Sequence, residues 1–175
     1  MIELAVGISG EMLAGKTTAA RFLERRGFAY TRISEVIDDV LRQRGEAINR
    51  ENQQRVGLEL HEERGQQWLC AQAIDRIPDE PRRIVIDGLR WPQDASYLRQ
   101  RFGKRFWQIH IYAPEELRRT RAAAGGKEKT FERASNHPVE SGIEAIGDLA
   151  DAVIVNNSDI ASLEQKVYET LDGEF

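Results

Sequence analysis

The residues best suited to chemistry form a glycine-bounded segment near the amino terminus. It has the spacing GxxxxGK[ST], and its members are Gly10, Glu11, Met12, Leu13, Ala14, Gly15, Lys16 and Thr17, with Thr18 next. Glycines allow a turn in which successive amide N–H groups point inward, and a helix that starts there adds partial positive charge. We expect this segment to hold the β- and γ-phosphates of a nucleotide, with Lys16 as a point charge on them and Thr18 near the α-phosphate.

Two residues are suited to hold the divalent cation that accompanies such a phosphate chain. The Thr17 hydroxyl would ligate a magnesium ion that bridges the phosphates. Asp87 ends the apolar run Ile84-Val85-Ile86, as an acidic residue does when it leaves a buried central strand to face a site. We expect its carboxylate to accept hydrogen bonds from the water shell of the ion. The sequence therefore predicts a site for ATP with Mg2+.

These residues need strands and helices to position them. Apolar runs bounded by turn residues predict strands over residues 1–8, 28–33, 83–87, 106–113 and 152–155. Helical periodicity predicts a helix up to Gly27, two or three helices over 34–77, and helices over 92–98, from Pro114 and over 162–171, with a loop at 78–81. Strands that alternate with helices favour an α/β fold, a five-stranded parallel sheet covered on both faces, with ligands at the carboxyl ends of its strands.

The composition is that of one ordinary globular domain. The chain has 175 residues, of which 41% are hydrophobic and 31% charged, and its net charge of -4 gives no overall attraction for nucleic acid or an anionic membrane. A single cysteine excludes an internal disulfide framework and suits a reducing compartment. No apolar run approaches the roughly 18 residues that span a bilayer. We expect one cytoplasmic domain, a monomer or a homodimer, with a small-molecule partner.

Several short elements together resemble the P-loop nucleoside and nucleotide kinases. The shared elements are the Gly-Lys-Thr-Thr of the phosphate loop, Ser34-Glu35, Ile86-Asp87-Gly88-Leu89-Arg90, the pair Arg118 and Arg121, and Val155-Asn156-Asn157. The resemblance covers nearly the whole chain and extends to dephospho-CoA kinase-like, adenylate kinase-related and viral-type deoxynucleoside monophosphate kinase proteins. It implies the three-layer P-loop NTPase fold, with a helical acceptor flap over about residues 34–77 and a small lid over about residues 122–142, a polar stretch with little periodicity.

The resemblance also implies roles on the acceptor side. Glu35 would lie near the acceptor, where it would take the proton of a hydroxyl, or orient sugar or base if the acceptor is a phosphate. Arg90 would grip an acceptor phosphate, because a guanidinium offers a planar fork of donors to its oxygens. Arg42 and Arg55 would bind the acceptor from the flap. Trp91 is a candidate to stack on an acceptor base.

The chain departs from these relatives at two places. Where they carry an arginine in the flap this chain has Asp38, and Arg42, one helical turn further, would compensate. In the lid, Arg118 and Arg121 match arginines that relatives aim at the transferred phosphoryl group, but a third expected arginine falls on Ala124. Loss of such a cation slows phosphoryl transfer, so we expect a slow enzyme or one tuned to an unusual acceptor. Alternatively, another residue supplies the missing positive charge. The candidates for that residue are Lys127 and Arg133.

These features favour a kinase that passes the terminal phosphoryl group of ATP to a nucleoside monophosphate. Dephospho-CoA is the alternative acceptor, because it would satisfy both Glu35 with a hydroxyl and Arg90 with a phosphate. A regulatory NTPase is another class, but the sequence has neither an Asn-Lys-x-Asp stretch nor a clear second NTPase signature. A nucleic-acid kinase is disfavoured by the acidic charge balance.

Overall fold

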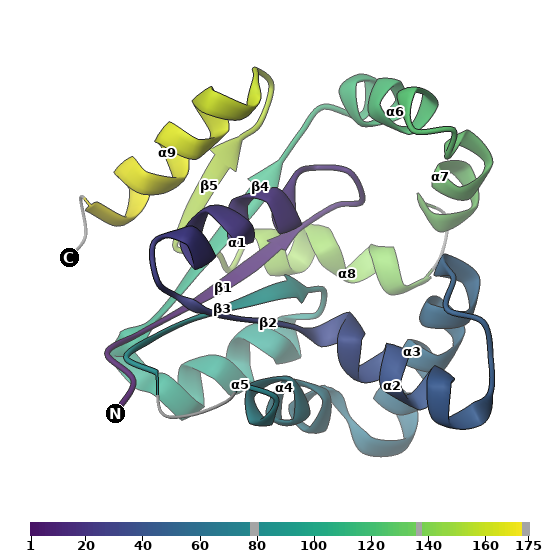
Figure 1. Cartoon of the computed structure of the whole chain (residues 1–175), viewed down its shortest axis with the longest axis horizontal. Coiled ribbons are helices and arrows are strands. Elements are labelled where there is room, and N and C mark those ends of the chain that lie inside the picture. The colour runs from purple at the N-terminus through teal and green to yellow at the C-terminus, as the bar shows by residue number, and fades with distance from the viewer. Residues whose placement is uncertain (78–80, 136–137, 173–175) are drawn as a thin grey trace.

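The computed structural model describes residues 1–77, 81–135 and 138–172, so most of the loop expected at 78–81 lies outside the described residues (Figure 1). Its centre is a five-stranded sheet in the order β2-β3-β1-β4-β5, and every neighbouring pair is parallel. The strands are β1 (Leu4–Gly10), β2 (Ala29–Arg32), β3 (Arg83–Leu89), β4 (Phe106–Tyr112) and β5 (Ala152–Val155). The predicted α/β class and the predicted parallel sheet are confirmed.

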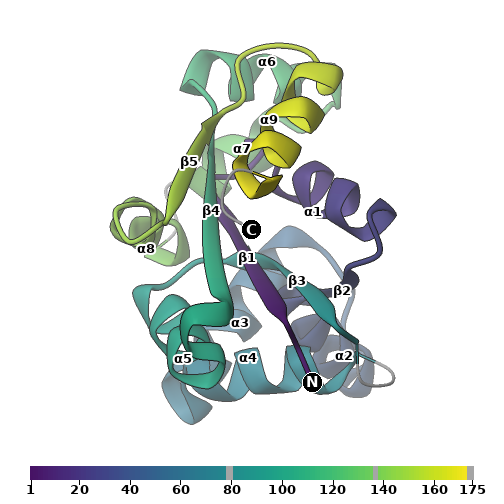
Figure 2. The ribbon, with the colours of Figure 1, turned by 90° about the vertical axis from the view of Figure 1, so that its left-hand side faces the viewer.

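Helices flank the sheet on both faces, as Figure 2 shows. They are α1 (Lys16–Arg25), α2 (Ile33–Arg44), α3 (Arg50–Arg64), α4 (Gln66–Asp75), α5 (Pro92–Phe102), the short 3-10 helix η1 (Gly103–Arg105), α6 (Glu115–Ala124), α7 (Glu128–Ser135), α8 (Pro138–Gly147) and α9 (Ile160–Asp172). Three helices fill the segment 34–77, at the upper end of the prediction. Within the described part of the chain, none of these helices has both the length and the apolar character that crossing a membrane requires.

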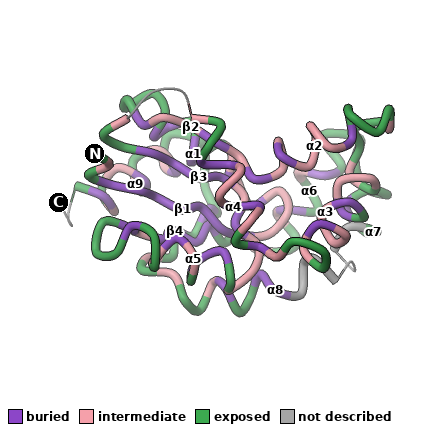
Figure 3. The backbone as a smooth tube through the Cα atoms, turned by 90° about the horizontal axis from the view of Figure 1, so that it is seen from below, coloured by how far each residue is buried: buried purple, intermediate pink, exposed green. Residues whose placement is uncertain are grey.

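Two hydrophobic cores hold the layers together, and the alternation of side chains in β1 separates them. Val6 and Ile8 pack with α1 and α9 on one face, whereas Ala5 packs with the core formed by α2, α3, α4 and α5 on the other. β1 is buried along its whole length because sheet and helices cover it on both sides (Figure 3). The buried central strand therefore fixes the position at which the phosphate loop begins.

The segment predicted as an irregular lid is largely helical. The sequence predicts a mobile loop or small lid over residues 122–142, but α6 continues to Ala124, and α7 and the first half of α8 follow within this range, with residues 136–137 outside the described part of the chain. Among the described side chains, the apolar residues buried in these two helices are Phe131 in α7 and Ile143 and Ile146 in α8. Because α7 spans only eight residues and α8 only ten, each offers too few apolar positions for a helical period to be recognised in the sequence.

Candidate active site

The phosphate loop lies between β1 and α1. Only glycine fits at the two glycine positions of its GxxxxGK[ST] motif. Gly10 has a φ of 140°, and a Cβ there would lie 2.2 Å from the Ile111 carbonyl oxygen of the neighbouring strand. Gly15 has a φ of 107°, and a Cβ there would lie 2.5 Å from Asn156 Nδ2. Leu13 also adopts a left-handed conformation, with a φ of 63°. The turn is therefore held tightly by β4 and by the segment after β5.

Lys16 begins α1 and folds back over the loop. Its side chain is buried, and Nζ donates a hydrogen bond of 2.6 Å to the Glu11 carbonyl oxygen. The first turn of α1 presents amide groups at the same place, where the helix dipole adds positive potential. The loop thus combines an ammonium group, amide donors and a helix amino terminus, which are the features that bind a phosphate chain.

Thr17 and Asp87 meet in the way that a shared magnesium site requires. Thr17 Oγ1 donates to Asp87 Oδ2 at 2.7 Å, although the two residues are 70 positions apart. Asp87 is almost fully buried, and its other oxygen, Oδ1, has no hydrogen-bond partner among the described residues. A buried carboxylate oxygen without a partner is costly unless a ligand or ion satisfies it. Oxygen donors of this kind suit Mg2+, so the residues present fit the ion.

β2 supplies two further groups around Asp87, which the sequence analysis did not identify. Tyr30 Oη donates to Asp87 Oδ2 at 3.1 Å, and Arg32 Nε lies 3.9 Å from the same oxygen. Burial, reinforced by the negative charge of Asp87, raises the pKa of Tyr30 far above its usual value, so the phenol stays protonated and keeps donating. Tyr30 and Arg32 are two residues apart in a strand, and this alternation is the signal that could have paired them.

A cleft of about 440 Å³ opens beside the loop. Among the predicted site residues, those that line it are Leu13, Gly15, Lys16, Thr17, Thr18, Asp87, Arg90 and Arg121. Arg32 and Arg50 add two guanidinium groups that were not predicted, and Asn156, Ser158 and Asp159 form the rim after β5. The chain is acidic overall, yet this cleft gathers five cationic side chains. Local positive charge of this kind attracts an anionic ligand.

The two predicted lid arginines take different positions. Arg121 lines the cleft, where Nη1 donates to the Leu13 carbonyl oxygen at 3.0 Å and Nη2 to the Asn156 carbonyl oxygen at 3.3 Å. Arg118 is buried instead, with Nη2 2.8 Å from Glu11 Oε1 and Nε 3.0 Å from the Ala113 carbonyl oxygen. Arg118 therefore ties α6 to the phosphate loop, and only Arg121 faces the cleft.

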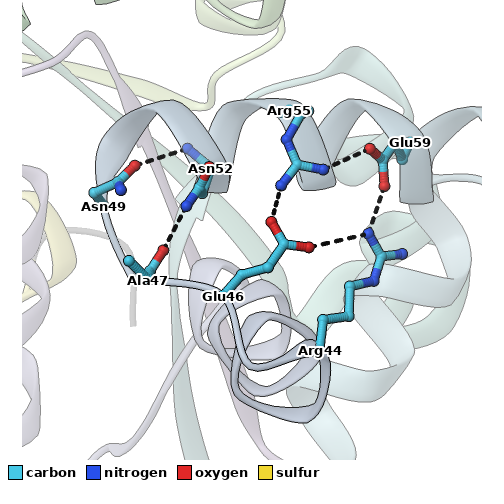
Figure 4. Close-up of polar contacts among 7 residues, drawn as sticks. All are labelled: Arg44, Glu46, Ala47, Asn49, Asn52, Arg55 and Glu59. Atoms are coloured by element: carbon cyan, nitrogen blue, oxygen red, sulfur yellow. Dashed lines mark hydrogen bonds and ion pairs between the residues drawn. The ribbon is translucent and has the colours of Figure 1, made fainter.

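Three predicted acceptor residues do not line the cleft. Glu35 pairs with Arg76 at 3.4 Å, and Arg42 pairs with Asp39 at 2.5 Å. Arg55 contacts both Glu46 and Glu59 in a ring of ion pairs that Arg44 completes, across the connection between α2 and α3 (Figure 4). Arg42 and Arg55 are thus engaged in exposed ion pairs on the surface of the flap, and their roles in acceptor binding stay predictions.

Trp91 does not offer the free ring face that base stacking would need. His61 of α3 stacks on it, with ring centroids 4.7 Å apart and an interplanar angle of 10°. A Cβ at Gly142 would lie 3.1 Å from Trp91 Cε3, so α8 also approaches the indole. The ring is part of the packing between α3, α5 and α8.

The model for the family described as AAA domain matches residues 6–140, from β1 into α8. The chain belongs to the AAA domain family. This match includes the whole phosphate loop, Asp87 and both lid arginines.

Relatives of this AAA domain extend over nearly its full length. The UPF0200 protein of Thermococcus onnurineus is 25% identical over 182 residues, which covers 98% of this chain and 97% of that protein. The UPF0200 protein of Methanothermobacter thermautotrophicus is 27% identical over 178 residues and covers 98% and 90% respectively. The similarity is therefore spread along both chains and is not confined to the phosphate loop.

Solved structures with a similar fold include several kinases. The APS kinase of Mycobacterium tuberculosis, in complex with AMPPNP and APS, has a TM-score of 0.64 at 13% identity and covers 98% of each chain. The dephospho-CoA kinase of Campylobacter jejuni has a TM-score of 0.58 at 16% identity and covers 96% of this chain and 95% of that one. Shikimate kinase of Acinetobacter baumannii, with shikimate, has a TM-score of 0.56 at 19% identity over 98% and 95%. The resemblance to P-loop nucleotide kinases is confirmed at the level of the fold.

Proposed function

We propose that this AAA domain transfers the terminal phosphoryl group of ATP, with magnesium, to a small nucleotide-like acceptor, and that the acceptor is a nucleoside monophosphate. The observation that carries the proposal is the Thr17–Asp87 pair, with its unpartnered carboxylate oxygen, in one cleft with Lys16 and Arg90. Phosphoryl transfer depends on positioning and on neutralising charge, and this cleft supplies both.

On the donor side, each residue has a separate task. The loop amides and Lys16 would bind the β- and γ-phosphates, and Thr17 and Asp87 would hold the magnesium ion. The ion, when bound, neutralises negative charge on the phosphate oxygens. Arg121, at the edge of the same cleft, would stabilise charge on the transferred group. Arg118 would act indirectly, because it holds Glu11 and so the shape of the loop.

On the acceptor side, the arrangement favours a phosphate over a hydroxyl. Arg32, Arg50 and Arg90 line the part of the cleft next to α2 and α3, and together they would bind an anionic group. Glu35, which a hydroxyl acceptor would need as a base, pairs with Arg76 and does not line the cleft. A phosphate acceptor is already anionic and needs no base, which places nucleoside monophosphates ahead of dephospho-CoA.

The test is an acceptor panel. The protein is incubated with ATP, magnesium and, in turn, each nucleoside monophosphate, a set of nucleosides and dephospho-CoA, and ADP release is followed. We expect at least one monophosphate to raise turnover well above the rate with ATP alone. Stimulation only by dephospho-CoA would replace the acceptor, and ATP hydrolysis that no acceptor changes would favour a regulatory NTPase.

A substitution of Arg90 tests the acceptor side of the proposal. We predict that Arg90→Ala raises the KM of the acceptor by about tenfold or more and that of ATP by less than about twofold, since a charged hydrogen bond to phosphate is lost only on the acceptor side. Arg42→Ala is the control, because Arg42 is exposed and paired with Asp39 outside the cleft. Equal changes in both KM values for Arg90→Ala would contradict the assigned role.

A further inference from the structure

A side pocket leads off the cleft between the flap helices. Its volume is about 40 Å³, enough for a few water-sized groups. It shares Ile33, Ser34, Ile37, Arg50, Gly88 and Arg90 with the larger cleft, so the two spaces adjoin. Its inner wall comes from α3 and α4, through Gln54, Gly57, Gln66 and Leu69. A ligand in the cleft can therefore extend one compact group into this pocket.

Two buried polar atoms in the pocket wall have no hydrogen-bond partner among the described residues. One is Oε1 of Gln66, whose residue is only 6% exposed, and the other is Oγ of Ser34. Buried polar atoms are almost always paired, because an unpaired one loses its hydrogen bond to water without replacement. Since both residues line a pocket that adjoins the cleft, a bound ligand is the natural partner for these atoms.

The pocket lining also includes a carboxylate, Asp94, and both of its oxygens already accept hydrogen bonds. Asp94 Oδ2 accepts from the backbone amides of Arg90 and Trp91, at 2.8 and 2.9 Å, and Oδ1 accepts from Cys70 Sγ at 3.3 Å. These bonds fix the turn after β3 from which Arg90 projects. Asp94 is therefore a support for Arg90, and Gln66 Oε1 is the buried amide oxygen in the described pocket wall that has no partner.

The character of the pocket defines what it can recognise. Arg50 and Arg90 stand where it meets the cleft and suit an oxyanion. Beyond them, an amide oxygen requires an N–H or O–H donor from the ligand. Trp91, the aromatic residue in its described lining, has His61 stacked on its ring. Recognition at this end must then come from hydrogen bonding and not from stacking on an aromatic ring.

We propose that the acceptor is an organic phosphate with a compact hydrogen-bond donor at its far end, and that Gln66 is the specificity-determining residue that reads this donor. The phosphate lies by Arg50 and Arg90, and the donor enters the side pocket to bind Gln66 Oε1, with Ser34 Oγ as a second contact. The inference rests on the proposed function. The donor is either an N–H edge of the nucleobase or a hydroxyl of the sugar, and the experiment distinguishes these sources.

The experiment measures binding by calorimetry with the donor site filled by AMPPNP and magnesium. The probes are AMP, CMP, GMP, UMP and ribose 5-phosphate, together with purine riboside 5'-monophosphate, which is AMP without its amino group. The proteins are the wild type, Gln66→Leu and the control Gln165→Leu, which makes the same change on the exposed face of α9. Circular dichroism checks that each variant is folded.

We expect Gln66→Leu to weaken the best-bound probe about tenfold, the cost of leaving its donor unpaired, and Gln165→Leu to change it by less than twofold. AMPPNP binding should be the same in all three proteins. If the donor is a base edge, ribose 5-phosphate binds weakly and is insensitive to Gln66→Leu. If it is a hydroxyl, ribose 5-phosphate binds as well as the nucleotides and is weakened by the same variant. When AMP is the best-bound probe, purine riboside 5'-monophosphate should bind the wild type about tenfold more weakly than AMP.

The inference is overturned if no probe binds the wild type, or if Gln66→Leu leaves every bound probe within twofold of its wild-type affinity. If Gln66→Leu does not fold, Gln66→Asn replaces it, because this shorter amide withdraws the oxygen and should weaken the same probes. The AMPPNP isotherm reports separately on the proposed function. If the protein binds AMPPNP and phosphorylates an acceptor, but Gln66→Leu leaves the acceptor affinity unchanged, only the inference is refuted.

Discussion

At the scale of single residues, the Asp87 carboxylate uses only one of its two oxygens for hydrogen bonds within the described protein. Oδ2 accepts from Thr17 and Tyr30, whereas Oδ1 has no partner among the described residues. Two donors on one oxygen fix the rotation of the carboxylate, so that the other oxygen has a defined direction. Residues that orient a metal-binding group in this way usually matter for ion affinity nearly as much as the ligands.

We therefore predict that Tyr30→Phe weakens magnesium binding. Loss of the phenol donor frees the Asp87 carboxylate to rotate, and the magnesium concentration needed for half-maximal ADP binding should rise about tenfold. Calorimetry of ADP at a series of magnesium concentrations measures this without turnover. Tyr168→Phe is the control, because its phenol bonds to Glu164 on α9 away from the cleft. An unchanged magnesium requirement in Tyr30→Phe would remove the positioning role.

At the scale of elements, the phosphate loop is held by its neighbours as much as by its own sequence. β4 abuts Gly10, Asn156 Nδ2 donates to the Ala14 carbonyl oxygen at 2.7 Å, and α6 reaches the loop through Arg118. The loop should therefore lose its shape when one of these supports is removed, even where the motif itself is intact.

Arg118→Ala tests the support from α6. Arg118 is 8% exposed and bonds to both Glu11 and the Ala113 carbonyl, so its removal should lower the free energy of unfolding by about 2 kcal/mol. Arg119→Ala, one residue along the same helix, breaks exposed ion pairs and a loose contact with the Phe131 ring, and should cost less than about 0.5 kcal/mol. Urea denaturation measures both, and equal losses would contradict the anchoring role.

The contact between β4 and α8 gives a pH-dependent element. His110 is buried, its Nδ1 lies 3.1 Å from Ser9 Oγ, and Gly147 of α8 packs against the ring. Burial, together with the positive charge of Lys16, lowers the pKa of His110 below its usual 6.5, although Asp148 opposes the shift. Below about pH 6.5 the unfolded chain takes up a proton at this residue and the folded protein does not, so stability falls as the pH falls towards the lowered value.

We predict a difference in pH dependence between the wild type and His110→Gln. Between about pH 6.5 and pH 5, the free energy of unfolding of the wild type should fall more steeply, by up to about 1.4 kcal/mol per pH unit. Glutamine fills similar space and does not titrate, so the variant should show a flatter curve. Urea denaturation across this range measures the slopes, and parallel curves would show that His110 carries no pH-dependent stability.

At the scale of the whole molecule, the sequence predicts the frame well because its signals are local. All five strands, the parallel sheet and the loop between β1 and α1 follow from apolar runs and from one motif with fixed spacing. Asp87 is also predicted, since the carboxyl ends of parallel strands converge at one edge of a sheet. Lys16, Thr17, Asp87, Arg90 and Arg121 all reach the cleft.

The sequence is least informative where long-range pairing decides which way a side chain points. Arg42, Arg55 and Glu35 have suitable chemistry, but local carboxylate or arginine partners hold them outside the cleft. Arg50 and Gln66 reach the acceptor side only because α3 and α4 are placed there by packing. The described part of residues 122–142 is mostly helical, but its helices are short and offer too few apolar positions, such as Phe131, for a period to be recognised.

The central claim is that the loop from Gly10 to Thr17 binds a triphosphate with Lys16 and a metal ion sharing its charge. Calorimetric titration of ATP, with and without magnesium, into the wild type, Lys16→Ala and the exposed control Lys104→Ala tests it most directly. We predict magnesium-dependent binding by the wild type and Lys104→Ala, and affinity lower by about a hundredfold in a still folded Lys16→Ala, since a charge-assisted contact is lost. Equal affinity in all three proteins, or no binding by the wild type, would contradict the account.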